Sequence, residues 1–102
     1  IAIDATGHFA YVTNATDNSL SAYAIDAAVG TLRPLGAAVP TGEGPRYVAI
    51  EPNGKFAYVV NVLSNDVFVH AIEPASGLPG PVGQRVAVGL SPASLAIVTP
   101  AP

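Results

Sequence analysis

A repeat of 47 residues limits the fold of this chain more than any other sequence feature. The segment FAYVTN, which starts at residue 9, returns as FAYVVN at residue 56. Pairing residues 1–50 with residues 48–97 without a gap gives 20 identities, far more than chance provides. The sequence therefore predicts two copies of one structural unit, followed by the start of a third.

Each unit is predicted to contain four short strands separated by turns. Aromatic and β-branched residues fill the strands, and clusters of Pro, Asn, Asp, Ser and Gly separate them. A 3.6-residue apolar period, which would indicate a helix, is not evident. The predicted strands are residues 1–4, 9–15, 20–26 and 32–40 in the first unit, and 47–51, 56–62, 67–73 and 81–88 in the second.

Neither face of the predicted sheets is clearly polar, so both faces need cover. In the strand at 56–61, Phe56, Tyr58 and Val60 point one way, and Ala57 and Val59 point the other. Four-stranded sheets that stack on one another provide this cover, and such a repeat is typical of a β-propeller. We therefore predict an all-β fold: a β-propeller fragment with two four-stranded antiparallel blades and the first strand of a third. The predicted units are residues 1–46, 47–93 and 94–102.

The two open sides of such a stack require partners. Leaving on the order of 500 Å² of apolar surface uncovered on one side forgoes roughly 12 kcal/mol, at about 25 cal/mol per Å². That loss is comparable to the whole stability of a small domain, roughly 5–15 kcal/mol. We therefore expect other propeller blades as partners, from further parts of the same chain or from identical copies that close a ring. The start at Ile1 favours the first arrangement.

Charge and composition exclude several classes of function. Four basic and seven acidic side chains give a net charge of −3, which argues against a nucleic-acid partner. The absence of cysteine excludes disulfides and thiolate sites, and no apolar run is long enough to span a membrane. Histidines and carboxylates do not show the spacing of metal ligands, so we expect neither a metal nor a cofactor.

The repeated motif resembles a known family. FAYVTN and FAYVVN are similar to the YVTN repeat of bacterial β-propellers. The segment GPRYVAIEPNGKFAYVVNVLSNDV at 44–67 resembles the lactonase-type seven-bladed propellers, which include the 6-phosphogluconolactonases. The resemblance implies a propeller whose active cleft uses Arg, His and Glu residues from segments that read GPRH and YVVNEL.

This chain matches that pattern only in part. Gly44, Pro45 and Arg46 are present, but Tyr47 stands where His is expected and Val62 stands where Glu is expected. A carboxylate can accept a proton and valine cannot, so lactone hydrolysis by this blade itself is not expected. The resemblance still allows such activity on other blades.

One rim of the predicted propeller is the candidate site. The turns at 41–47 and 61–66 lie on the same rim in a propeller of this strand order. An arginine there can clamp a carboxylate or phosphate. The expected ligand of the rim is a small anion or a sugar. The alternative for this arginine is an ion pair with Glu43. The predicted ligand-binding residues are Arg46, Tyr47, Glu43, Asn61 and Asp66, with no catalytic residue among them. We also expect the repeated Asn14 and Asn61 to hydrogen-bond loop backbone.

Three functions follow from these observations. The leading hypothesis is a non-catalytic propeller scaffold that binds a ligand or partner at the rim. The second is a lactone hydrolase of the 6-phosphogluconolactonase type, and the third is a structural cell-surface repeat. The resemblance to YVTN surface proteins favours an exported location, periplasmic or on the cell surface, over the cytoplasm.

Overall fold

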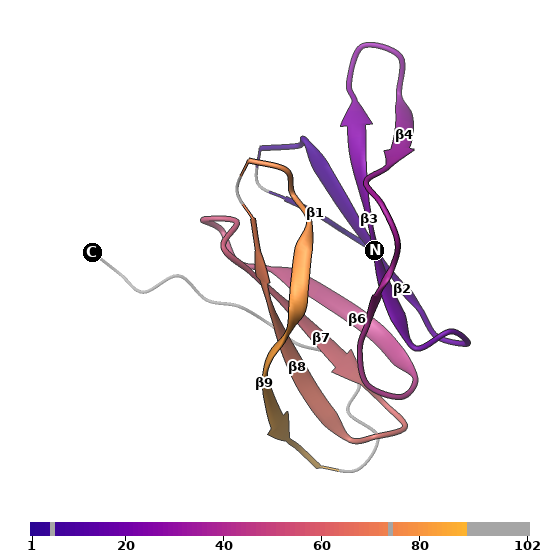
Figure 1. The fold of residues 1–102 in the computed structure, drawn as a ribbon, viewed down its shortest axis with the longest axis vertical. Helices are drawn as coiled ribbons and strands as arrows, with labels where there is room; N and C mark the ends of the chain where they lie inside the picture. The colour runs from indigo at the N-terminus through magenta and orange to yellow at the C-terminus, as the bar shows by residue number, and fades with distance from the viewer. Residues whose placement is uncertain (5, 74, 90–102) are drawn as a thin grey trace.

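Two antiparallel sheets make up the structure (Figure 1). The structure is a computed structural model and describes residues 1–4, 6–73 and 75–89. The first sheet contains β1 (Ala2–Ile3), β2 (Phe9–Asn14), β3 (Ser19–Asp26) and β4 (Thr31–Pro34), and β5 (Val39–Pro40) also pairs with β3. The second sheet contains β6 (Pro45–Ile50), β7 (Phe56–Asn61), β8 (Asp66–Ile72) and β9 (Pro79–Ala87). The predicted all-β fold with two blades is confirmed. The strand predicted within 94–102 lies outside the described residues.

The sequence repeat is also a repeat of backbone conformation. Asn18 and Asn65, which share a repeat position, both adopt left-handed φ angles, of 54° and 56°. They lie in the turns between β2 and β3 and between β7 and β8. Asparagine tolerates this region better than most residues, which explains why it recurs there. The same turn therefore closes the central hairpin of each blade.

The fourth strand differs from the prediction in the first blade. Instead of one strand over 32–40, β4 pairs with the end of β3 and β5 pairs with its beginning. Gly36, with a φ of 127°, lies in the bend between them, in a conformation that other residues rarely adopt. In the second blade the corresponding β9 is one strand, and its register against β8 shifts on both sides of His70.

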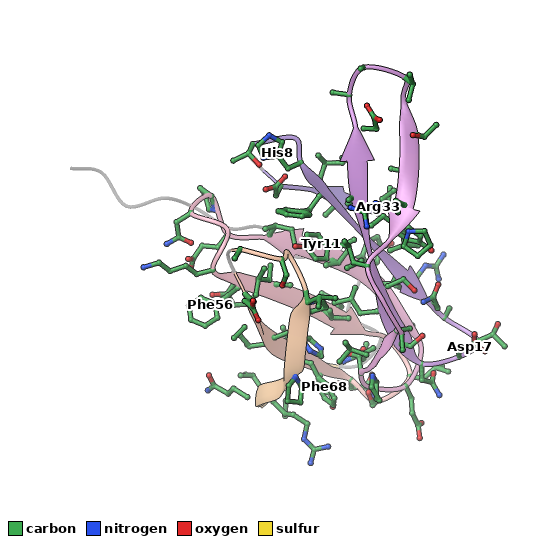
Figure 2. The ribbon with its side chains drawn as sticks, turned by 45° about the horizontal axis from the view of Figure 1, so that its top comes forward. His8, Tyr11, Asp17, Arg33, Phe56 and Phe68 are labelled. Atoms are coloured by element: carbon green, nitrogen blue, oxygen red, sulfur yellow. The ribbon has the colours of Figure 1, made fainter. Side chains whose placement is uncertain are left out.

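The hydrophobic core lies between the two sheets. Tyr11, Leu20 and Ala22 of the first sheet pack against residues of the second, and Figure 2 shows Tyr11 between the two ribbons. The buried residues of the second sheet in this core are Ala57, Val59 and Ile72. The Tyr11 hydroxyl also donates a hydrogen bond of 2.7 Å to the carbonyl oxygen of Gly77, in the turn between β8 and β9. The interface thus combines apolar contact with the buried hydrogen bond of Tyr11.

The outer faces of the two-sheet stack are uncovered, as a comparison of equivalent residues in the two blades shows. Ile3 is 59% exposed on the first blade, whereas its repeat equivalent Ile50 packs against the core. Phe56 on the second blade is 37% exposed and stands clear of the first sheet in Figure 2, whereas its equivalent Phe9 packs against the core. Equivalent faces are therefore covered where a blade adjoins them and open where none does.

Candidate functional site

The two turns predicted to share a rim lie against each other. The amide N–H of Val62 donates to the Gly44 carbonyl at 3.0 Å, and those of Leu63 and Ser64 donate to the Glu43 carbonyl at 3.1 and 3.3 Å. In return, the Glu43 amide donates to the Ser64 hydroxyl oxygen at 3.1 Å. Four hydrogen bonds thus join the turn that enters the second blade to the turn between β7 and β8, and they fix the backbone that presents the predicted site residues.

The first blade anchors the same rim. The Asn18 carbonyl accepts the amide N–H of Thr41 at 2.9 Å, and the Asn18 side-chain oxygen accepts the amide N–H of Gly44 at 3.0 Å. Gly44 has a φ of 64°, and a Cβ there would meet the side chain of Leu63 at 2.7 Å. Glycine is therefore required at this tight approach. The rim turn is held from both blades at once.

A β-bulge displays Arg46 and Tyr47 at the entrance to the second blade. Pro45 pairs with Asn61 and Tyr47 pairs with Val60, so Arg46 is the extra residue of the pair of strands. A bulge changes the direction of the side chains around it and increases the local twist. Arg46 is exposed, and Tyr47 is 38% exposed. The rim therefore offers a guanidinium and a phenol from consecutive positions.

The acidic side chains of this rim differ in their surroundings. Glu43 is exposed, and its backbone rather than its carboxylate holds the turn. The Asp66 carboxylate is half-buried, and its Oδ1 accepts hydrogen bonds from Asn61 Nδ2 at 3.0 Å and from the Ser64 hydroxyl at 2.8 Å. Asp66 therefore stabilises the turn through at least one of its oxygens.

The predicted rim residue Asn61 lies inside the protein. It is fully buried, so it supports the turn and does not offer its amide to a ligand from solvent. The expected bonds from the repeated asparagines to loop backbone are replaced by bonds to side chains: Asn61 donates to Asp66, and Asn14 donates to Ser19 and Ser21 at 3.1 and 2.7 Å. The reason is the register, which places Asn61 directly opposite Asp66 and Asn14 directly opposite Ser19.

Sequence reasoning did not find the buried histidine below this rim. His70 is fully buried; its Nδ1 lies 2.9 Å from the Gly80 carbonyl, and its Nε2 lies 3.4 Å from the Thr41 hydroxyl. Burial lowers the pKa of His70 below its ordinary 6.5, although the bond to the Gly80 carbonyl acts in the opposite direction. The neutral ring donates from Nδ1 to Gly80 and accepts at Nε2. The sequence signal that could have pointed to this histidine is that the equivalent position of the first blade holds a different residue, Tyr23.

Two further observations limit the chemistry of the described part of the chain. Among these residues, no group of three or more His, Cys, Asp and Glu side chains could hold a metal ion. Each buried side-chain nitrogen or oxygen in this part has a hydrogen-bond partner. The rim therefore offers binding groups on a fixed backbone, with Arg46 and Tyr47 at its surface.

Comparison with known proteins supports the resemblance found in the sequence. The profile of the family described as "Lactonase, 7-bladed beta-propeller" matches residues 1–95. The chain is similar to the solved structure of a periplasmic gluconolactonase from Pseudomonas aeruginosa, with 38% identity and a TM-score of 0.88. This similarity covers 96% of the present chain and 27% of that protein.

Two other solved structures are similar over most of this chain. A putative 6-phosphogluconolactonase from Bacteroides uniformis has 28% identity and a TM-score of 0.80, over 88% of this chain and 26% of that one. One from Bacteroides fragilis has 26% identity and a TM-score of 0.78, over 85% and 24%. The chain thus spans about a quarter of the length of these three proteins. No curated protein matches it.

Proposed function

The chain belongs to the lactonase family of seven-bladed β-propellers, and we propose that its two blades help to form a propeller that hydrolyses a sugar-acid lactone. In this proposal the rim of residues 41–47 and 61–66 binds the substrate but does not supply the catalytic acid or base. The observation that carries it is the fixed display of Arg46 beside Tyr47, in a chain whose relatives include a gluconolactonase.

The geometry of the rim suits a binding role. Arg46 is exposed on a β-bulge, where its guanidinium can form paired hydrogen bonds to a carboxylate or phosphate. Tyr47 adds a ring face and a hydroxyl next to it. Backbone bonds from both blades hold the turn beneath them, so little conformational freedom is lost when a ligand binds. A lactone with an anionic or strongly polar substituent fits this pair.

A catalytic role for these two blades has less support. Val62 occupies the position at which the resemblance leads us to expect a glutamate, and valine does not transfer protons. Asp66, the nearest carboxylate along the chain, is engaged with Asn61 and Ser64. We therefore assign proton transfer to other blades of the propeller. A binding propeller without catalytic activity is the second candidate, and Val62 is the observation that favours it.

The partners in this proposal are further blades. The open faces of Ile3 and Phe56 are the counterparts of faces that are covered at the interface between the two blades. Identical copies of a two-blade unit give an even number of blades, whereas the family has seven. This mismatch supports blades of different sequence, rather than further copies of these two, as the neighbours.

We also propose that the protein is exported. One of the solved relatives is periplasmic, in agreement with the expectation from the YVTN motif. In the described residues the structure contains no helix with the length and hydropathy that crossing a membrane requires.

The test is hydrolysis of glucono-δ-lactone and its 6-phosphate by the full-length protein. We expect turnover above spontaneous hydrolysis. Arg46→Ala should raise KM roughly tenfold to a hundredfold, the effect of losing one or two charge-assisted hydrogen bonds, and should leave kcat within about twofold. Arg33→Ala is the matched control, because Arg33 is also exposed but lies on β4, away from the rim.

The possible outcomes separate the two candidates. If the full-length protein shows no turnover but binds gluconate, and Arg46→Ala abolishes that binding, the binding propeller is correct and the enzyme is not. If Arg46→Ala and Arg33→Ala give the same KM as the unchanged protein, the rim does not contact the substrate.

A further inference from the structure

A pocket of about 250 Å³ lies between the two blades, away from the rim described above. It is formed by the turns that follow β1 and β6, so it exists only where two blades adjoin. His8, which lines the pocket, is labelled in Figure 2 at one end of the first blade. The lining residues used below are Asp4, Thr6, His8, Phe9 and Asn53.

A carboxylate is fixed in the wall of this pocket. Asp4 Oδ1 accepts the amide N–H groups of His8 and Phe9 at 2.9 and 3.0 Å, and Oδ2 accepts the Thr6 hydroxyl at 2.6 Å. Partial burial by itself raises the pKa of Asp4, but these hydrogen bonds and the electrostatic attraction of His8 outweigh it and hold the pKa below the ordinary 3.8. Each carboxylate oxygen can accept more than one hydrogen bond. Asp4 is therefore an ionised acceptor that cannot rotate.

Side chains that can donate hydrogen bonds line the pocket on both blades. His8 is exposed, and its imidazole supplies an N–H from the first blade. Asn53 is exposed on the second blade, and its side-chain oxygen accepts the amide N–H of Lys55 at 3.1 Å. The NH₂ group of Asn53 is then its donor toward the pocket. The lining thus includes one acceptor and two side chains that can donate, from two segments far apart in the sequence.

The remaining wall is apolar and includes an aromatic ring. Phe9 and Ile72 line it, and the rings of His8 and Phe9 meet edge to face with centroids 6.4 Å apart. Tyr11 lies at the base with its hydroxyl bonded to the Gly77 carbonyl. Burial and the charge of Asp4 raise the pKa of Tyr11 to about 12, so Tyr11 brings no charge to the pocket.

Size, polarity and charge together select a class of ligand. The volume is below the roughly 300 Å³ at which pockets for drug-sized molecules begin, so it suits a single small ring. A purely aromatic ligand would cover the Asp4 carboxylate without offering it a hydrogen-bond donor, which is unfavourable. An anion would be repelled by Asp4, and the described lining residues include no Lys or Arg, only the imidazole of His8, to offset that repulsion.

From these features we propose that the pocket between the blades binds one neutral monosaccharide ring. The apolar face of the sugar lies against Phe9, and its hydroxyls bond to Asp4, His8 and Asn53. This site is separate from the rim and takes a ligand of different charge: the rim, with Arg46, suits an anionic lactone or acid, whereas the pocket, with Asp4, suits a neutral sugar. The inference therefore does not depend on lactone hydrolysis.

The experiment is a titration of the full-length, ¹⁵N-labelled protein with D-glucose, and with D-gluconate as an anionic probe of similar size. We expect glucose to bind with a Kd on the order of 1 mM and to shift the amide signals of residues 6–9 and 53–55. Gluconate should bind there at least about tenfold more weakly. His8→Ala and Asn53→Ala should each weaken glucose binding about threefold to tenfold, because each removes one hydrogen bond from an exposed position outside the core.

Two further variants sharpen the test. Asp4→Asn keeps an acceptor for the His8 and Phe9 amides but removes the charge, so the preference for glucose over gluconate should fall. Arg46→Ala on the rim should leave glucose binding unchanged. The proposal is overturned if glucose causes no saturable shift at about 50 mM, or if gluconate shifts the amide signals of residues 6–9 and 53–55 at concentrations as low as glucose does. It is also overturned if His8→Ala and Asn53→Ala both bind glucose like the unchanged protein, or if the shifts fall on the rim turns. Lactone hydrolysis is measured by a separate turnover assay, so the pocket proposal can fail while the proposed function stands.

Discussion

Removing one hydroxyl from the interface between the blades should destabilise the protein measurably. Tyr11 is fully buried, and its hydroxyl donates a 2.7 Å hydrogen bond to the Gly77 carbonyl of the neighbouring blade. Tyr11→Phe keeps the packing of the ring but leaves that buried carbonyl without its partner. Because an unsatisfied buried polar group costs about 1–3 kcal/mol, the free energy of unfolding should fall by about that amount. The assay is equilibrium urea unfolding of the full-length protein, followed by far-UV circular dichroism.

The repeat supplies a second variant that tests whether a further blade covers the open face. Tyr58 occupies the position equivalent to Tyr11 but is only half-buried here, with its hydroxyl 3.5 Å from Glu51 Oε2. If another blade covers this face in the full-length protein, Tyr58→Phe should cost about as much as Tyr11→Phe. The exposed control Tyr47→Phe should change stability by less than about 0.5 kcal/mol. If Tyr11→Phe leaves the free energy of unfolding unchanged, the role of the bond to Gly77 is refuted. If Tyr58→Phe leaves it unchanged, the covering blade is refuted.

Two more predictions concern a glycine and the buried histidine. Gly77→Ala should destabilise the protein by about 2–4 kcal/mol, because φ is 75° and a Cβ would collide with the Phe9 ring. The control Gly7→Ala, at a φ of 77° in open space, should cost only about 1–2 kcal/mol. Equal losses of stability in the two variants would refute the collision. His70 has a lowered pKa when folded, so its contribution to stability is complete above the unfolded pKa of about 6.5 and is lost as the pH falls below it. Urea unfolding at pH 7.5 and 5.5 should show a loss of at most about 1.4 kcal/mol, which His70→Tyr abolishes; an equal loss in that variant would contradict the assignment.

The sequence predicted the blades because their signals are local and occur twice. The paired turns at Asn18 and Asn65 and the alternation around Phe56 depend on the backbone of a single hairpin, and the antiparallel order then places the turns at 41–47 and 61–66 side by side. The bulge at Arg46 was not predictable, because it depends on how the rim turn is bonded to both blades.

Burial was harder to predict than strand position, for a physical reason. Asn61 and His70 both lie on strands in which neither face is clearly polar, so the local sequence does not show that their side chains face the first blade. Their burial follows from contacts with residues far away in the sequence, such as the 3.4 Å approach of Thr41 to His70. Packing between blades decides which polar side chains reach solvent, and one blade read by itself does not contain that information.

The repeat also gives a rule for separating binding residues from structural ones in this chain. A position that is the same in both blades is expected to serve the contact between blades, as Tyr11 does here and as we propose for Tyr58. A position whose residue differs between the blades does not serve that shared contact, but it becomes a candidate for binding only if its side chain is also exposed to solvent. His70 differs from its repeat equivalent Tyr23 but is fully buried, so it is a structural residue and not a candidate for binding. Arg46 differs from Ala93 in the next unit and is exposed on a fixed turn, which makes it the residue whose substitution tests the rim most directly.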